Sequence, residues 1–168
     1  MIFRPARAIG LTIGGLAVLV ALLLAGLLAA FASSWDTSFP QFLAFAGALL
    51  LLALAALFAY WTYTCFTLSS ALDENGLSLR WGLMRLLIPM GQIQRLVPGR
   101  EAKPPPIQGV NWWGYHVGRA AVEGLGEVLF YSTHSSPWQI TYVVTRSRCY
   151  GLSPENSIRF SHELQQRL

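Results

Sequence analysis

Charged residues are scarce in this chain: they make up 12% of its 168 residues, whereas hydrophobic residues make up 54%. Soluble domains average about 25% charged residues. The shortage is concentrated at the front, since no charged residue lies between Arg7 and Asp36 or between Asp36 and Asp73. A polar surface this sparse excludes a soluble globule made of the whole chain, and it divides the sequence into an apolar front and an ordinary back half.

Cysteine is also scarce, with Cys65 and Cys149 as the only two and no CxxC pair. This excludes a disulfide framework and a zinc ribbon, and we expect both thiols to be free. The formal net charge of +4 is modest, and the basic residues are scattered along the sequence. Nucleic-acid binding requires a clustered basic face, so a nucleic-acid partner is not expected.

Motifs for catalysis and metal binding are missing as well. The sequence contains no GxSxG, HExxH or P-loop motif. The GLG run at 124–126 is a lone GxG that turn formation explains. His116, His134 and His162 lack ligand spacing such as HxxxH. We therefore expect no metal, no cofactor and no catalytic residues, and predict that the protein is not an enzyme.

What the front half does contain is two long apolar runs, from about Ala8 to Ala32 and from about Phe42 to Tyr63. A helix that spans a bilayer needs about 20 apolar residues, so both runs are long enough. Aromatic residues favour the headgroup level, and they flank the runs as Trp35, Phe39, Phe58, Tyr60, Trp61 and Tyr63. Because the loop between the runs is short, residues 1–64 are predicted to form an antiparallel transmembrane hairpin.

The composition of these runs indicates what the helices do. Small residues recur at a spacing of four, as Gly10 and Gly14, Ala44 and Ala48, and Ala55 and Ala59. This spacing lets helix backbones approach closely in lipid. Neither run contains an ionisable residue, and such residues usually mark ion or proton pathways in membranes. The helices are therefore interpreted as an anchor in the lipid bilayer, not as a transporter or channel.

The basic residues predict how the helices are oriented. Arg4 and Arg7 precede the first helix, and Arg80 and Arg85 follow the second, whereas the loop between them has no basic residue. The positive-inside rule then predicts a multi-pass protein of the inner (plasma) membrane with both termini in the cytoplasm. An alternative is signal-peptidase cleavage after the AFA run at 30–32. The back half would be cytoplasmic under either interpretation.

Residues 65–168 are expected to form one domain that consists mostly of strands, because apolar and polar residues alternate in short runs. The predicted strands are Thr64–Leu72, Gly76–Trp81, Leu83–Pro89, Ile93–Pro98, Glu127–Thr133, Gln139–Thr145 and Arg148–Leu152. Residues 134–137 are predicted to join the fifth and sixth of these as a hairpin loop. Ser153, Pro154 and Glu155 are typical of a helix start, so a helix is predicted from there to the C-terminus.

The stretch from Gly99 to Arg119 is predicted to be irregular. It begins with a stiff spacer, Lys103 and three prolines, and ends in an aromatic cluster. A loop of this length is uncommon in a compact domain and is often functional. The candidates for a surface that contacts a partner or the membrane interface are therefore Trp112, Trp113, Tyr115, His116 and Arg119. The alternative is that the rings plug the open end of a small barrel.

The order of elements and three stretches of sequence resemble a family of bacterial membrane-anchored pleckstrin-homology-like (PH-like) proteins. The stretches are LDENGLSLRWG, IPMGQIQRLVP and VVTRSRCYGLSPENSIRF, and the resemblance covers roughly residues 64–168. It implies a membrane α-helical hairpin followed by an α+β domain. In that domain, a PH-like seven-stranded β-barrel or sandwich is capped by a C-terminal helix.

The resemblance also implies a function, with one departure from the family pattern. PH domains that bind phosphoinositides place Lys and Arg around the first hairpin loop, whereas here that loop is the acidic DENG run at 73–76. Phosphoinositide binding is therefore not supported, and the resemblance implies a membrane-tethered scaffold that recruits a protein partner without catalysis. Two alternatives remain: a ligand-sensing or enzymatic membrane protein that uses the 99–119 loop, and an accessory subunit of a membrane complex.

Overall fold

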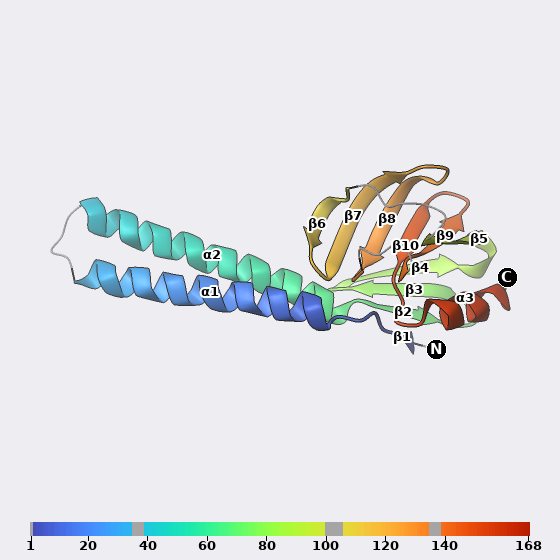
Figure 1. The fold of residues 1–168 in the computed structure, drawn as a ribbon, viewed down its shortest axis with the longest axis horizontal. Helices are drawn as coiled ribbons and strands as arrows, with labels where there is room; N and C mark the ends of the chain where they lie inside the picture. Colours follow the sequence, from blue (N-terminus) through green and yellow to red (C-terminus); the bar gives the residue numbers. More distant parts are fainter. Residues whose placement is uncertain (1, 35–38, 100–105, 135–138) are drawn as a thin grey trace. The chain divides into compact units, whose positions relative to one another are not determined.

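The computed structural model describes residues 2–34, 39–99, 106–134 and 139–168. The chain divides into two compact units, which are drawn in Figure 1 and described separately below. One unit is Leu11–Tyr63, and the other combines Met1–Gly10 with Thr64–Leu168. The first ten residues therefore belong to the same unit as the C-terminal half of the chain.

Helices α1 (Ala8–Ser33) and α2 (Phe39–Thr67) supply the helical unit. Both are long and apolar enough to cross a membrane, judged by length and composition. Large apolar side chains are exposed along both helices, among them Leu16, Leu23, Leu49 and Leu50. A helix that is apolar on all sides is typical of a lipid-facing segment.

Small residues pack α1 against α2 within this unit. A Cβ atom added to Gly14 would lie 2.3 Å from Thr62 Oγ1, and one added to Gly47 would lie 2.9 Å from Leu28 Cδ2. The alanines that are buried in the two helices are Ala21, Ala25, Ala32, Ala44, Ala48 and Ala55. Of the predicted small residues, Ala44 and Ala48 therefore line the contact between the helices. Ala59 is exposed and does not take part in it.

The first sheet of the other unit has four antiparallel strands in the order β1-β2-β3-β4. They are β1 (Ile2–Phe3), β2 (Ser69–Leu72), β3 (Gly76–Trp81) and β4 (Met84–Pro89). The predicted turn at 73–76 is confirmed, because Asp73 Oδ1 accepts hydrogen bonds of 2.9 Å from the N–H groups of Asn75 and Gly76. Gly82, with φ +58, begins the two-residue turn between β3 and β4.

The second sheet has six strands in the order β5-β9-β10-β8-β7-β6. A short 3-10 helix, η1 (Met90–Gln92), leads into it from the first sheet. Its strands are β5 (Ile93–Pro98), β6 (Gln108–Trp112), β7 (Tyr115–Val122), β8 (Gly126–Ser132), β9 (Thr141–Thr145) and β10 (Cys149–Leu152). Strand β10 pairs with β9 in antiparallel fashion and with β8 in parallel fashion.

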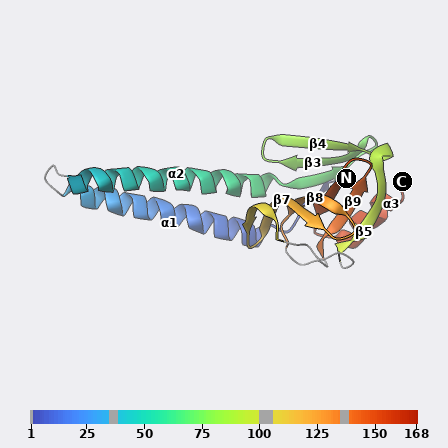
Figure 2. The same ribbon diagram turned by 90° about the horizontal axis from the view of Figure 1, so that it is seen from above.

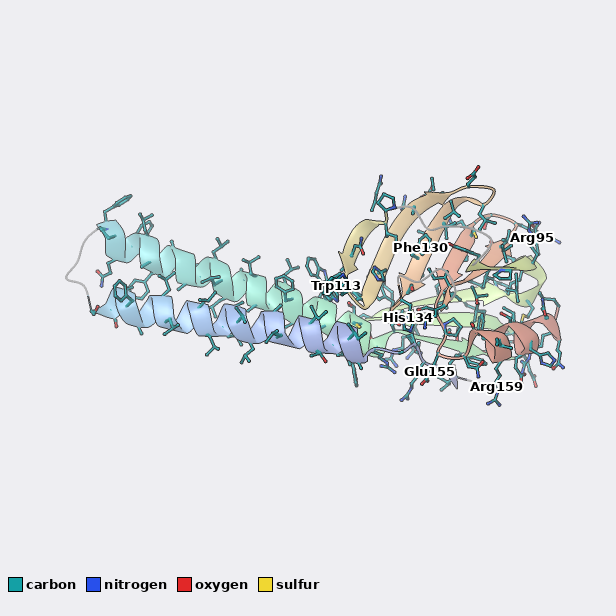
Figure 3. The ribbon with its side chains drawn as sticks, in the orientation of Figure 1. Arg95, Trp113, Phe130, His134, Glu155 and Arg159 are labelled. Atoms are coloured by element: carbon teal, nitrogen blue, oxygen red, sulfur yellow. The ribbon has the colours of Figure 1, made fainter. Side chains whose placement is uncertain are left out.

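The main core combines side chains from both sheets and the C-terminal helix α3 (Ser157–Gln165). Phe160 and Leu164 of α3 are fully buried there with Leu72 and Leu77. Phe3 of β1 joins them, and its ring centroid lies 5.2 Å from that of Phe160. A second cluster, on the other face of the six-stranded sheet, is centred on Phe130, Tyr142 and Val128, with Phe130 labelled in Figure 3.

The predicted fold class is confirmed as two apolar helices followed by β-sheets and a C-terminal helix. The described residues contain ten strands in two sheets, where the sequence predicted seven, and the sheets form an open sandwich without closing into a barrel. The predicted strand at Thr64–Leu72 is wrong in its first half, because α2 continues to Thr67. Within this extra turn, the hydroxyl of Thr67 donates a hydrogen bond to the carbonyl of Thr64.

The prediction that Gly99–Arg119 is irregular is wrong for the described residues, since β6 and β7 form a hairpin there. Residues 103–105 of the spacer lie outside the described residues. Gly109 and Gly118 are directly paired across the hairpin. A Cβ atom added to Gly118 would lie 2.2 Å from Gln108 O, so glycine serves there for a close approach of two strands.

Two further predictions in the C-terminal part are wrong. Strands β8 and β9 are not joined as a hairpin, because β10 lies between them in the sheet; residues 135–138 lie outside the described chain. The last helix begins at Ser157 with Asn156 as its N-cap, whose Oδ1 accepts from Arg159 N at 2.9 Å. Ser153 is instead buried and accepts a hydrogen bond of 2.8 Å from Thr133 N.

Candidate interaction site

The five residues predicted to form a contact surface all lie on the β6–β7 hairpin, but they differ in exposure. Trp113 projects from the turn, where it is 80% exposed (Figure 3). Tyr115 is 0% exposed and His116 only 5%, while Trp112 is partly buried. Arg119 is exposed but lies four positions beyond Tyr115 along β7. The hairpin therefore brings the aromatic rings together at its turn and leaves Arg119 apart from them.

Tyr115 is the centre of a buried hydrogen-bond network. Its hydroxyl lies 2.7 Å from Thr64 Oγ1 and accepts a hydrogen bond of 2.5 Å from Trp81 Nε1. Its ring centroid is 5.2 Å from that of Trp112. Nearby, Gly82 N donates to Thr67 Oγ1 at 2.8 Å. These bonds tie the last turn of α2 to β3 and β7, so Tyr115 has an internal, structural position.

The turn of the hairpin rests on the beginning of α1. Gly114 has φ +82, and a Cβ atom added to it would lie 2.6 Å from Gly10 N. A Cβ atom added to Gly10 would in turn lie 2.4 Å from Gly114 O. Backbone approaches backbone here, so neither position has room for a side chain. This contact fixes the turn from which Trp113 projects.

His116 faces the interior with an unusual hydrogen-bond pattern. Its Nδ1 lies 2.6 Å from Oδ1 of Asn111, its partner across the hairpin. Its Nε2 is buried and has no hydrogen-bond partner among the described residues. Burial, and then the neighbouring His134, lower the pKa of His116, which favours the neutral ring. Within the described chain no three His, Cys, Asp or Glu side chains gather as metal ligands, so the ring is best understood as a buried neutral group.

Arg119 belongs to a different surface, a polar cavity of about 370 Å³ at one end of the six-stranded sheet. Its guanidinium lies 3.4 Å from Glu127 Oε1, with both side chains exposed. An exposed ion pair of this kind contributes about 0–1 kcal/mol. The other charged residues lining this cavity are Arg146 and Arg148, so it is predominantly basic.

A second cavity, the inter-sheet cleft, was not predicted. It has a volume of about 320 Å³ and lies between the two sheets. The first sheet contributes Leu79, Trp81, Met84, Arg85 and Leu86, and the second contributes Leu129, Tyr131, Arg148 and Tyr150. The rings of Trp81 and Tyr131, one from each sheet, meet edge to face in its wall, with centroids 5.9 Å apart.

The charged residues that line the inter-sheet cleft are all basic. In the part of the chain that the structure describes, the charged residues that line it are Arg85 and Arg148, and no acidic side chain does. Burial, together with Tyr150, raises the pKa of Tyr131, which keeps that phenol neutral. The cleft can therefore accept apolar groups from a ligand that carries negative charge.

One signal in the sequence could have pointed to this cleft. Strand β8 reads VLFY at 128–131, apolar at successive positions, which is typical of a strand covered on both faces. Val128 and Phe130 belong to the second core cluster. Leu129 and Tyr131 lie on the opposite face and line the cleft. The partner residues on β3 and β4 lie about fifty positions earlier in the chain, and local patterns do not reveal that they face β8.

Comparison with known proteins identifies the family of the β-rich unit. The family described as "Bacterial PH domain" matches residues 68–168, which is more than half of the chain. The chain belongs to the bacterial PH domain family. No curated protein and no solved structure matches it. The resemblance inferred from the sequence is thus confirmed, and a bacterial PH domain beside two helices that can span a membrane makes the protein a membrane-associated module.

Proposed function

We propose that this protein is a membrane-tethered interaction module with no catalytic activity. Helices α1 and α2 anchor the PH domain at the cytoplasmic face of the inner membrane, and the domain recruits a protein partner there. The inter-sheet cleft carries this proposal, because it is an open apolar cavity on a domain of a family that is typically non-catalytic.

The N-terminal residues support the proposed topology. Strand β1 precedes α1, yet it pairs with β2, which follows α2. Phe3 is buried in the core of the PH domain. If α1 crosses the bilayer, α2 must cross it again so that Phe3 and β2 lie on the same side. Together with the basic residues Arg4, Arg7, Arg80 and Arg85, this supports a multi-pass protein with both termini in the cytoplasm. Signal-peptidase cleavage after residues 30–32 would remove Phe3, and with it a side chain of the PH-domain core.

Exposed apolar side chains next to the inter-sheet cleft support protein binding. Leu83 in the β3–β4 turn is 84% exposed, and its neighbour Met84, which lines the cleft, is 65% exposed. Contiguous exposed apolar groups commonly mark interaction sites. Trp113 and Arg119 are the two residues of the original candidate set that stay largely exposed, and we propose them as secondary contacts with the partner or the membrane interface.

Site-specific photocrosslinking in native membranes tests this function. A photoreactive phenylalanine analogue is placed at Leu83 or Met84, next to the cleft, and as a control at Ile158, which is 83% exposed on α3. We expect the same discrete protein adduct from both cleft positions and none from Ile158. Adducts that are absent at both cleft positions, or identical at all three, would contradict the proposal.

A further inference from the structure

Strand β4 leaves one edge of the four-stranded sheet open. In the described chain it pairs with β3 and with no other strand, and Figure 2 shows it on the outside of its sheet. Edge strands usually carry charged side chains, proline or a bulge that discourages pairing, and β4 has Arg85 as its one charged residue. In β4 the only proline is Pro89 at the last position, and the strand runs from Met84 to Pro89 with an unbroken register.

The β3–β4 hairpin fixes which backbone groups face outward from that edge. Its loop has two residues, so the flanking pair Trp81 and Met84 is hydrogen-bonded, and hydrogen-bonded pairs then alternate along the ladder. Arg85 and Leu87 fall at the intervening pairs. Their N–H and C=O groups therefore point away from β3 and are available to a fifth strand.

The inter-sheet cleft lies beside this edge. Met84 and Leu86 lie on the face of β4 that lines it, opposite Leu129 and Tyr150 of the second sheet. A strand added to β4 would continue the same pleated face, so every second side chain would enter the cleft. A volume of about 320 Å³ fits a few apolar side chains of an extended segment, and nothing as large as a folded domain.

Arg85 borders the cleft, but it alternates with Met84 and Leu86 along β4 and so belongs to the opposite face of the hairpin, which carries an unbalanced positive charge. Arg80 and Arg85 are direct partners across β3 and β4, and both are exposed. Like charges placed directly opposite each other destabilise a sheet. Neither arginine has an ion-pair partner among the described residues. An acidic side chain on an added strand, next to Arg85, would complete this row. A second copy of β4 would instead bring another Arg85 to the row.

We infer that the partner is an extended peptide segment that pairs with the free edge of β4 as a fifth strand. Its apolar side chains, at alternate positions, fill the inter-sheet cleft, and the acidic side chains between them face Arg80 and Arg85. Main-chain hydrogen bonds to Arg85 and Leu87 supply affinity, and the cleft and the arginines supply specificity. This inference rests on the proposed function and specifies the chemistry of the partner.

A random octapeptide library displayed on phage, selected on the full-length protein in lipid nanodiscs, tests the inference. We expect enriched sequences in which apolar and acidic residues alternate. A synthetic copy of an enriched peptide should protect the outward amides of Arg85 and Leu87 from hydrogen exchange. Enriched peptides without alternation, or protection confined to other strands, would overturn the inference.

Matched variants separate backbone pairing from side-chain contact. Leu87→Pro removes one outward N–H group without removing a bond to β3, whereas Leu87→Ala keeps that group. Peptide affinity should fall about tenfold in Leu87→Pro, as expected for one lost hydrogen bond, and change little in Leu87→Ala. Arg85→Glu should also weaken binding, and it provides a second test if Leu87→Pro unfolds the domain. Equal affinity in all variants would rule out strand addition.

Other occupants give distinct results, and each would overturn the inference. Retention by phosphatidylglycerol vesicles, with no peptide enriched, would indicate a lipid in the cleft. A dimer in light scattering that Leu87→Pro dissociates would indicate a second copy of the chain. If crosslinks form at Leu83 and Met84 but peptide affinity is insensitive to Leu87→Pro, strand addition fails while the proposed interaction function stands. If neither crosslinks nor peptides are found, both fail.

Discussion

At the scale of single residues, the hydroxyl of Tyr115 connects three segments that are far apart in the sequence. It contacts Thr64 at the end of α2 and accepts from Trp81 at the end of β3. A hydroxyl that satisfies two buried partners is costly to remove, because those partners lose a hydrogen bond inside the protein. Tyr115 therefore explains why the aromatic cluster is partly interior. A sequence pattern does not show which aromatic side chains are buried, so it could not distinguish this structural role from a contact surface.

Replacing this hydroxyl gives the first prediction. Tyr115→Phe keeps the ring but removes the group that contacts Thr64 and Trp81, so we expect the domain to lose about 1–3 kcal/mol of stability. Thermal unfolding of the protein in detergent measures the loss. Tyr60→Phe, on an exposed side chain of α2, is the control and should change little. Equal effects of the two variants would contradict the structural role of Tyr115.

His116 gives a prediction about pH. Burial, and then His134, hold its pKa below the value of 6.5 that the ring has when exposed. Between the two pKa values the unfolded chain binds a proton that the folded protein does not. Stability is therefore full above about pH 6.5 and is lost as the pH falls toward the folded pKa. Unfolding measured from about pH 7 to pH 5 should show this decline, and His116→Gln should reduce its slope. His134, whose pKa is also lowered by burial, accounts for part of any remaining slope.

At the scale of elements, neighbouring glycines in α1 differ in what surrounds them. A Cβ atom on Gly14 would lie 2.3 Å from Thr62 Oγ1 of α2, whereas one on Gly15 would meet nothing within 4 Å. We expect Gly14→Leu to separate the helices and cost about 1–3 kcal/mol, as overpacking usually does. Gly15→Leu should be tolerated. The midpoint of thermal unfolding in detergent compares the two variants, and a similar loss in both would argue against close packing at Gly14.

Elements with a clear two-residue period were predictable, and elements whose pairing depends on glycine were not. Strands β3 and β5 were predicted with the bounds they have, because turn residues bound both strands and apolar and polar residues alternate in β3. Strands β6 and β7 were missed because the proline spacer and the aromatic cluster after it were interpreted as one irregular loop, although Gly109 and Gly118 pair with each other in a hairpin. The start of α3 was misplaced because Ser153 hydrogen-bonds to Thr133, a contact between distant residues.

At the scale of the whole molecule, the chain's first residues complete a domain whose other strands begin at Ser69. Phe3 fills the core beside Phe160, and Ile2, next to it in β1, is exposed. A two-residue strand ahead of basic residues cannot be predicted, because its sequence equally fits the start of a signal peptide. The inter-sheet cleft could not be predicted for a similar reason, since its lining comes from both sheets.

The N-terminal strand gives a prediction at this scale. Phe3→Ala empties a buried position, so we expect it to destabilise the PH domain by about 3 kcal/mol, at the lower end for phenylalanine removal from a core. Ile2→Ala, which alters the exposed neighbour, should have little effect. Hydrogen exchange in α3, measured on the full chain, reports the change directly because Phe3 packs on Phe160. Unchanged exchange in Phe3→Ala would show that β1 does not stabilise the domain.

The position of β10 between β8 and β9 also has a consequence for biosynthesis. The ribosome releases β8 and then β9, but the strand that joins them is synthesised only at Cys149–Leu152. Until then, β8 and β9 each present an unpaired edge, and unpaired edges recruit other chains. If the helices anchor the chain in a membrane as proposed, a nascent chain interrupted before residue 149 would hold both edges among other copies in the same plane.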